Sequence, residues 1–436
     1  MPDGSMPQSE PTSQGDRGLQ GPVNASDSSL KTDSVSAEIQ SRVRASATDQ
    51  SPAPEADEYE RTTGERLTET LNIDSWEPAH RLAEAYGRFE REVADAVRTE
   101  ALVRRDVRKQ VLPLLSRAPH APRGAGHYFV SPGQLRDVQK KVLFNGLTQA
   151  VDGTSVPFES LPLKMIQIGV ALVNYSGDNG TWCHRIYRRD VRMRGGNLVE
   201  DAIAILERRR RDGDRQPSVT ELLRRAVMTY GERAVLAQKA TAPWRMGHGN
   251  PLDYALLTGS GDARIIGLAL PVLRDLVLDH KQFVFVPSET KDELLLTIGN
   301  ALLPLEYAIV KDFREYLADI LAGHYRGEGF DQMRVRLDDF SAAAGPSLIM
   351  GVFRASAFAP SQVFYAHADH AHEAALIAMA DAMLVDHRGF PMLLDLADRL
   401  CVGLLGPETL VRPTTAAYAQ AQQGTQYLPE RRTRSA

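Results

Sequence analysis

The stretch Leu147-Thr148-Gln149-Ala150-Val151-Asp152-Gly153-Thr154-Ser155 joins an apolar, β-prone run to a single carboxylate followed by glycine. It predicts a strand that ends near Asp152, with the side chain directed into a cleft at a glycine turn. A carboxylate in that position can hold magnesium or manganese against a phosphate. Asp-Gly pairs are also common turn formers, so a purely structural role for Asp152 is the alternative.

The residues that follow this stretch predict a sheet that helices interrupt. Residues 164–175 are apolar and β-rich, a Gly-Asp-Asn-Gly turn follows, and residues 181–191 complete a hairpin. We expect helices at 198–210, 219–239, 265–278, 292–302, 371–385 and 392–405. Further strands are expected at 254–257, 282–286, 333–337, 348–354 and 362–366. This order predicts an α/β fold with a mixed sheet flanked by helices.

The composition divides the 436 residues into four parts. Residues 1–60 are rich in Ser, Asp, Glu, Gln, Pro and Gly, which predicts a disordered acidic tail. Residues 61–145 are mostly of helical pattern and predict an N-terminal helical arm, for packing or dimerisation. The α/β domain spans 146–406, and 407–436 forms a C-terminal tail whose end is basic.

Charge and cysteine content exclude several classes of protein. With 51 basic and 56 acidic residues the formal net charge is −5, which excludes a globally basic nucleic-acid coat but not a local basic groove. Two cysteines, Cys183 and Cys401, exclude a disulfide scaffold and suit a reducing cytoplasm. The N-terminus lacks a signal-peptide pattern, and the most apolar stretch is interrupted by Arg274, so we expect a cytoplasmic protein outside the membrane.

Three short motifs, in this order, are similar to those of the NurA nuclease family. They are Ala150-Val151-Asp152-Gly153-Thr154, Leu256-Leu257-Thr258-Gly259-Ser260, and Gly389-Phe390-Pro391 followed by Leu394 and Ala397-Asp398-Arg399. The resemblance covers residues 147–405. It implies an RNase H-like fold, manganese-dependent cleavage of DNA with Mg²⁺ as the alternative ion, a homodimer, and docking on a hexameric HerA-type ATPase.

The resemblance also suggests which residues form the site. Two-metal phosphodiester hydrolysis requires carboxylates that converge on ions about 3.5–4 Å apart. Asp152 matches the family's first aspartate, and a glutamate is expected on the helix before the second Asp-Gly-Ser strand. We assign that glutamate to Glu232, with Glu221 as the competitor and a solvated helix surface as the bland alternative for both. Asp152 and Glu232 are thus the expected metal ligands, with Asp398 as a third catalytic residue.

Three positions depart from the family pattern. Thr258 stands where the family has aspartate, and a threonine hydroxyl is a poor metal ligand beside a carboxylate. Asp253 or Asp262 could replace it from the flanking loop. Phe390 replaces a tyrosine, and Asp398 replaces a histidine, although an aspartate can still bind a divalent cation. These changes weaken the case for an active enzyme.

A second group of polar residues, His367 to Glu373, consists of metal-binding residue types. His370 and His372 lie two apart, which is not the spacing of a helical histidine pair. We therefore expect a polar strand-to-helix turn capped by Asp369. The alternative is that this group supplies metal ligands lost elsewhere.

Contacts with DNA would be directed mainly at its phosphates. We expect them from the hairpin arginines Arg185, Arg188 and Arg189, and from Trp244 with Arg245, where the indole could stack on a base. For each arginine run, a solvated face is the alternative. No phosphate-binding loop followed by Lys-Ser/Thr is found, so an ATP-driven step would need a partner.

Three hypotheses follow. The chain is a NurA-like nuclease that processes DNA ends with a HerA-type ATPase in repair or anti-phage defence. Alternatively, it is a catalytically impaired scaffold that keeps the fold and the docking surface. The third hypothesis is an unrelated α/β protein whose motif order is coincidental. A cluster of at least three carboxylates around Asp152 would favour the first.

Overall fold

The computed structural model describes residues 58–424, except 77, 79–80, 120, 160–162, 190–219 and 323–329. The chain divides into two compact units, residues 1–92 and 93–436. In the first unit, α2 (Glu58–Thr63), α3 (Leu67–Thr70) and the short turn Ile73–Ser75 precede the start of α4 (Leu82–Asp106). All that follows concerns the second unit.

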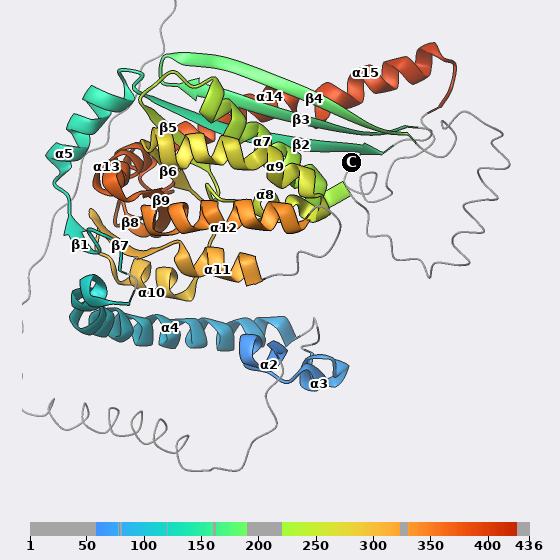
Figure 1. The fold of residues 1–436 in the computed structure, drawn as a ribbon. Helices are drawn as coiled ribbons and strands as arrows, with labels where there is room; N and C mark the ends of the chain where they lie inside the picture. The colour runs from blue at the N-terminus through green and yellow to red at the C-terminus, as the bar shows by residue number, and fades with distance from the viewer. Residues whose placement is uncertain are drawn as a thin grey trace, which may run out of the picture. The chain divides into compact units, whose positions relative to one another are not determined.

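A nine-stranded mixed sheet forms the centre of the second unit (Figure 1). Its strands are β1 (Gly126–Phe129), β2 (Thr148–Glu159), β3 (Leu163–Asn174), β4 (Gly177–Arg189), β5 (Trp244–His248), β6 (Phe283–Val286), β7 (Glu306–Asp312), β8 (Leu348–Arg354) and β9 (Gln362–His367). The spatial order is β1-β7-β8-β9-β6-β5-β2-β3-β4.

One half of the sheet has RNase H-like connectivity. Strands β2, β3 and β4 form an antiparallel meander, and β5 lies parallel to β2 on its other side. Strand β6 then lies parallel to β5. An RNase H-like sheet has three antiparallel strands, followed in the chain by two strands that run parallel to the first. The expected RNase H-like mixed sheet is therefore confirmed.

The other half of the sheet is antiparallel throughout. Strand β9 pairs with β6, β8 with β9, β7 with β8, and β1 with β7. Residues 126–129, which we expected within a helical arm, thus form the edge strand of the same sheet.

The remaining helices lie between these strands in the chain or follow the last of them. They are α5 (Pro132–Val138), α7 (Thr220–Gln238), α8 (Tyr254–Leu257), α9 (Ala263–Arg274), α10 (Glu293–Ala301), α11 (Arg314–Ala322), α12 (Phe330–Ser347), α13 (Ala371–Ala382), α14 (Met392–Leu405) and α15 (Pro407–Gln420). Asp262 and Asp292 cap helices α9 and α10, because each accepts a hydrogen bond from a free backbone amide of the first turn.

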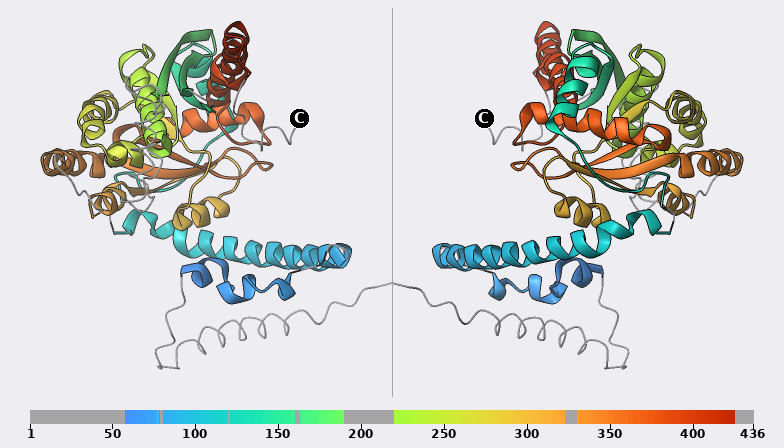
Figure 2. Two further views of the ribbon diagram at one scale, coloured as in Figure 1. Left: turned by 90° about the vertical axis from the view of Figure 1, so that its right-hand side faces the viewer. Right: turned by 90° about the vertical axis from the view of Figure 1, so that its left-hand side faces the viewer.

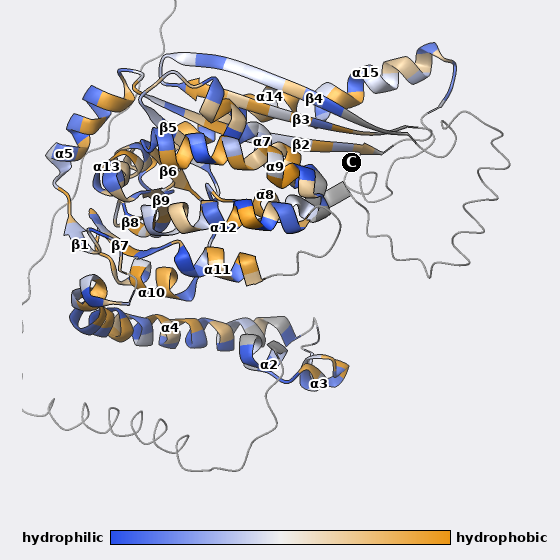
Figure 3. Cartoon of the chain, viewed as in Figure 1, coloured by the Kyte–Doolittle hydropathy of each residue, from blue (hydrophilic) through white to orange (hydrophobic). Residues whose placement is uncertain are grey.

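The helices cover both faces of the sheet. Apolar residues of α7, α9, α10, α11 and α12 form one core, and those of α5, α13 and α14 form a second. Figure 2 separates α7 and α9 on one side from α14 and α15 on the other. Figure 3 shows hydrophobic and hydrophilic residues sharing these helices, as expected where one face is buried.

Several expected elements differ from the structure. Residues 254–257 form helix α8, not a strand, because Asp253 caps a helical turn by accepting a hydrogen bond from the Ala255 amide at 2.8 Å. The expected strand at 333–337 lies within α12, where tertiary packing overrides the alternating pattern. Strands β5 and β7 were not expected. Residues 407–420, assigned to the tail, form α15, which packs Leu410 against Val156 and Phe158 of β2.

Some expectations fall outside the described residues. They are most of the acidic tail, the helix at 198–210 and the basic end of the chain. Among the described helices, none has the length and apolarity needed to cross a bilayer.

Candidate nuclease site

The sheet register brings Asp152 beside the end of β5. Val151 pairs with Gly247, so Asp152 and His248 are neighbours on adjacent parallel strands. Nδ1 of His248 lies 3.5 Å from Oδ1 of Asp152. The carboxyl ends of parallel strands are where ligands bind in open α/β sheets. Asp152 is not at the end of its own strand, because β2 continues to Glu159. It lies where the neighbouring strand β5 ends.

Glu232 reaches the same place from α7 across Gly153. A Cβ atom at Gly153 would lie 2.6 Å from Oε1 of Glu232, closer than carbon and oxygen can approach. The glycine therefore leaves the space that this carboxylate occupies. Both Asp152 and Glu232 are buried, as is Asp253 at the start of α8.

The buried charges shift one another's protonation. Burial raises the pKa of Glu232 to about 7, and the charge of Asp152 adds to this, while Arg233 opposes it. Burial alone would lower the pKa of His248, but its hydrogen bond with Asp152 and the nearby carboxylates leave it raised. The buried carboxylates of Asp152 and Glu232 thus repel each other, and a bound cation would reduce this repulsion.

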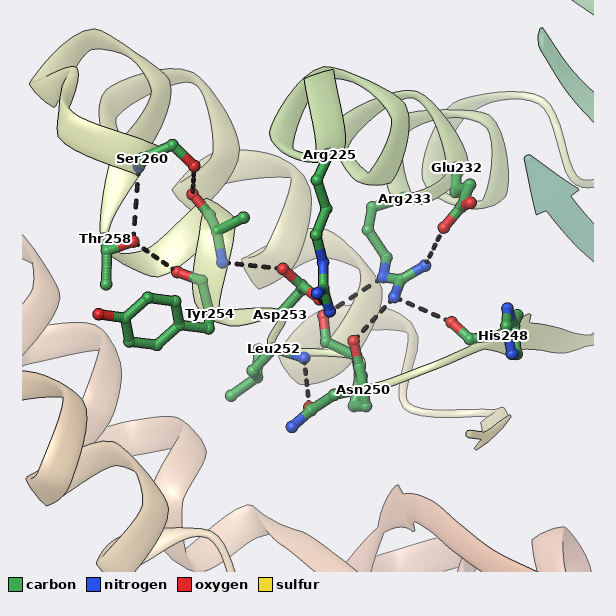
Figure 4. Close-up of polar contacts among 12 residues, drawn as sticks. Arg225, Glu232, Arg233, His248, Asn250, Leu252, Asp253, Tyr254, Thr258 and Ser260 are labelled. Atoms are coloured by element: carbon green, nitrogen blue, oxygen red, sulfur yellow. Dashed lines mark hydrogen bonds and ion pairs between the residues drawn. The ribbon is translucent and has the colours of Figure 1, made fainter. Parts of the chain in front are cut away.

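Arg233 joins the glutamate to the loop after β5 (Figure 4). Its Nη1 donates to Oε2 of Glu232 at 3.0 Å. Its Nη2 donates to the carbonyl oxygens of His248 at 3.1 Å and Asn250 at 2.7 Å. The guanidinium lies over the ring of Phe285, 4.5 Å from its centroid. Since Arg233 is only 1% exposed, it is an internal cation that fixes α7 to the end of β5.

Two cavities open around these residues and share His248 and Ser288. The Glu232 cavity, of about 460 Å³, is also lined by Arg225, Arg233 and Asp253. The Asp152 cavity, of about 350 Å³, is lined by Asp152, Arg388, Phe390, Asp395 and Asp398. The site is therefore one acidic centre with a cavity on each side of His248.

Asp398 faces this centre from α14, on the opposite side of the sheet from α7. Burial raises its pKa, and the charges of Asp152 and Asp395 contribute. Beneath it, the buried Cys401 accepts a hydrogen bond from the backbone of Thr154, and burial together with Asp152 raises the pKa of its thiol. Asp152 and Asp398 thus line one cavity, whereas Glu232 lines the other.

The expected equivalence of Thr258 does not hold. Thr258 follows α8, donates its hydroxyl to the carbonyl of Tyr254 at 2.8 Å, and lines neither cavity. The strand that follows the glutamate helix is β5, so the residue at the expected aspartate position is His248, followed by Gly249. Phe390 does line the Asp152 cavity, with its ring edge-on to His248 at a centroid distance of 6.0 Å.

The group from His367 to Glu373 forms a strand-to-helix turn, as expected, but its cap differs. His367 accepts a hydrogen bond from the Asp369 amide at 3.1 Å, so the histidine is the capping residue. His372 Nδ1 lies 2.8 Å from the Tyr307 hydroxyl, and Asp369 pairs with Lys281 at 3.2 Å. These side chains have separate structural partners.

Arg185, Trp244 and Arg245, the expected nucleic-acid residues whose side chains are described, line neither cavity. Arg185 is exposed on β4 and donates to Gln167 Oε1 at 2.8 Å. Arg188 and Arg189 lie farther along β4, and their side chains are outside the described residues. Trp244 is 8% exposed and packs in the core, so its ring is not accessible for stacking on a base. Arg245 is half-buried, and burial lowers its pKa.

Sequence reasoning missed three members of the site: His248, Arg233 and Arg388. The sequence signal that could have identified His248 is the turn-prone segment Gly-His-Gly-Asn, which follows a short strand. That strand has few β-branched residues and was therefore not predicted. Asp253 had been named as a substitute for Thr258, and it does line the Glu232 cavity. Because residues 254–257 were expected to form a strand, the second site position was assigned to Thr258 and not to the end of β5.

The donor set agrees with a divalent cation in its chemistry. Among the described residues, no three His, Cys, Asp or Glu side chains are grouped as ready metal ligands. However, Asp152 and Glu232 offer buried carboxylate oxygens, which Mn²⁺ and Mg²⁺ prefer, and their mutual repulsion favours a bound cation. The residues present therefore fit such an ion by charge and ligand type.

The sheet order and the acidic centre define an RNase H-like fold with a carboxylate site at the strand ends. No family model and no curated protein matches the sequence. Among solved structures, the NurA nuclease from Sulfolobus solfataricus aligns with 68% of this chain and 95% of its own length, at 9% identity and a TM-score of 0.37. NurA with manganese aligns with 61% of this chain and 91% of its own, at 6% identity and a TM-score of 0.34. NurA bound to dAMP and manganese aligns with 61% and 90%, at 9% identity and a TM-score of 0.29.

Proposed function

We propose that this chain is a NurA-like, divalent-metal-dependent DNA nuclease. The observation that supports it most is the buried pair Asp152 and Glu232 at the end of parallel strand β5, with Asp398 facing the same centre. Phosphodiester hydrolysis needs carboxylates that converge where a phosphate can enter. The open cavities on both sides of His248 provide that access.

Asp152 and Glu232 would hold the cation, Mn²⁺ by preference and Mg²⁺ as the alternative. When bound, the ion would supply Lewis-acid chemistry to the scissile phosphate. The chain's own residues do the rest. Arg233 holds the Glu232 carboxylate in place, His248 orients Asp152, and Phe390 contacts the histidine ring edge-on.

The resemblance extends the proposal to partners and setting. The chain would act on DNA ends as a homodimer together with a hexameric HerA-type ATPase, in repair or anti-phage defence, in the cytoplasm. The hairpin arginines Arg185, Arg188 and Arg189 stay in this proposal as contacts for DNA phosphates outside the cavities. No ATP-binding loop is present in the sequence, so the motor must be the partner.

The test is the degradation of linear DNA in the presence of Mn²⁺, comparing the wild type with Asp152→Ala and Glu232→Gln. We expect each variant to lose more than about 100-fold in rate, the upper value for loss of an outer-shell partner. Calorimetric titration with Mn²⁺ should show weaker binding in both variants. Cleavage by Asp152→Ala at the wild-type rate would remove that residue from the mechanism.

The second candidate function is a scaffold that docks on the ATPase without cutting. It is favoured by the lack of a third ready ligand among the described residues, and by the phenylalanine at position 390. Under this alternative the wild type binds DNA or the ATPase but shows no Mn²⁺-dependent cleavage. The same assay therefore separates the two functions.

A further inference from the structure

Two arginine–aspartate ion pairs border the acidic centre, one in each cavity. In the Glu232 cavity, Nη2 of Arg225 lies 3.1 Å from Oδ2 of Asp253. In the Asp152 cavity, Arg388 pairs with Asp395. The two pairs come from different elements, α7 and α8 on one side and the segment before α14 with α14 itself on the other.

Both pairs have the same asymmetry. The Arg225 side chain is 64% exposed and its aspartate 10%, while Arg388 is 48% exposed and its aspartate 13%. The carboxylates belong to the cavity walls, and the guanidinium groups reach solvent. Since each guanidinium is exposed, an anion in solvent can reach it and compete with the aspartate for it. A phosphate is such an anion, because it accepts two parallel hydrogen bonds from one guanidinium.

The arginines are placed along a path through the centre. Arg225 and Glu232 are seven residues apart on α7, about two turns, and so lie on one face of the helix together with Met228 and Thr229, which also line the cavity. On the other side, the Arg388 guanidinium lies over the Phe390 ring, 5.8 Å from its centroid, and that ring contacts His248. Since His248 lines both cavities, the order along the path is Arg225, the acidic centre, Arg388.

We propose that Arg225 and Arg388 bind two backbone phosphates of a single DNA strand, one on each side of the scissile phosphate, each exchanging its aspartate for the phosphate. The inference rests on the proposed function, which makes DNA the substrate. It adds that the substrate is single-stranded and that the strand runs from Arg225 past the acidic centre to Arg388. Both cavities are open to solvent and share His248 and Ser288, so one strand could pass both arginines.

The test measures binding without cleavage. Full-length protein carrying Asp152→Asn, in buffer with a chelator, is titrated against a short fluorescent single-stranded oligonucleotide at several salt concentrations. Arg225→Gln and Arg388→Gln should each weaken binding by about fivefold and reduce the slope of log affinity against log salt by about 0.7. Asp253→Asn and Asp395→Asn should each tighten binding, because the competing carboxylate charge is gone.

Arg264 and Asp262 supply the matched control. They also form an ion pair with an exposed arginine, and Asp262 caps α9 as Asp253 caps α8, but neither residue lines either of the two cavities. Arg264→Gln and Asp262→Asn change the net charge by the same amounts. Thermal melting of each variant verifies that it is folded.

Three results would overturn the inference. The first is that Arg225→Gln and Arg388→Gln weaken binding no more than Arg264→Gln. The second is that the two cavity aspartate variants tighten binding no more than Asp262→Asn. The third is a duplex probe that binds equally well with the same dependence on both arginines. Failure of the proposed function looks different: the wild type would not cleave with Mn²⁺, whatever the binding data show.

Discussion

Gly153 decides how close two acidic side chains can come. It has no side chain, and Glu232 fills the space that a Cβ would need. Its backbone lies in the extended strand β2, so the glycine is required for space and not for backbone conformation. Glu232 can therefore approach Asp152 only because residue 153 has no Cβ atom.

We expect Gly153→Ala to displace the Glu232 carboxylate and weaken Mn²⁺ binding by about 10- to 100-fold, the range for disturbed metal-site partners. Calorimetric titration with Mn²⁺ measures this effect. Gly403→Ala on α14 is the control, because nothing lies within 4 Å of a Cβ there. Unchanged Mn²⁺ affinity in Gly153→Ala would show that Glu232 is not a ligand.

The residue types of the site could be read from the sequence more easily than their arrangement. The strand and glycine pattern pointed to Asp152, whereas Glu232 and Asp398 followed from the resemblance to the NurA family. His248 could not be named, since its role depends on the pairing of β5 with β2. Arg233 was passed over because a single arginine next to a glutamate gives no sign that it will be buried.

At the scale of elements, Asp381 connects three of them. Its Oδ1 accepts a hydrogen bond from the hydroxyl of Tyr175 after β3, and its Oδ2 accepts one from the amide of Leu393 in the first turn of α14, at 2.9 Å. Burial raises the pKa of Asp381 to about 6, against these hydrogen bonds, which lower it. The position of α14, and with it that of Asp398, depends on this carboxyl group.

This predicts a specific pH dependence of stability. The folded state holds the Asp381 proton more tightly than the unfolded state, whose pKa is near 3.8. The stabilisation is therefore complete below that value and is lost as the pH rises through about 6, by about 3 kcal/mol in total. Asp381→Asn, which resembles the protonated form, should remove this loss. Denaturant unfolding from pH 4.5 to 7 measures about 2 kcal/mol of it.

The exposed Asp386 provides the control for that experiment. Asp386→Asn should leave the wild-type pH dependence in place, because its side chain is 65% exposed. If Asp381→Asn keeps the same decline in unfolding free energy as the wild type, another group is responsible for it.

Elements were predicted best where the pattern was long and periodic. The hairpin of β3 and β4 and the helix α14 match their expected ranges closely, because alternation and amphipathic spacing are unambiguous there. The short strand β5 was missed and the short helix α8 was read as a strand. Both segments have only four or five residues, which is too short for a helical or strand repeat to show in the hydrophobic pattern. The neighbouring strand decides the conformation of β5, and the capping residue decides that of α8.

At the scale of the whole unit, one ion pair ties its first residues to the sheet. Arg108 donates to both oxygens of Glu306 on β7, at 2.6 and 3.0 Å, and to the carbonyl of Ala301 at 2.9 Å. Glu306 is buried, yet its pKa is lowered, because hydrogen bonds from Arg108, Leu303 and His127 outweigh the effect of burial. The segment after α4 is thereby attached to the antiparallel half of the sheet.

We expect Arg108→Met to lower the unfolding free energy by about 1.5–3 kcal/mol, the range for hydrogen bonds to a charged group. The double variant Arg108→Met/Glu306→Gln should recover part of this loss, since no unpaired charge then stays buried. Chemical denaturation measures both. A double variant that is no more stable than the single one would show that the charge of Glu306 is not the cause.

The strand order also has a consequence for synthesis. The RNase H-like half, β2 to β6, is contiguous in the chain and can form as soon as it leaves the ribosome, whereas β9, which joins it to the other half, comes much later. Asp398 and Arg388 come later still, on and just before α14. A nascent chain therefore exposes Asp152 and Glu232 before Arg388 and Asp398, which line the same region, have been synthesised.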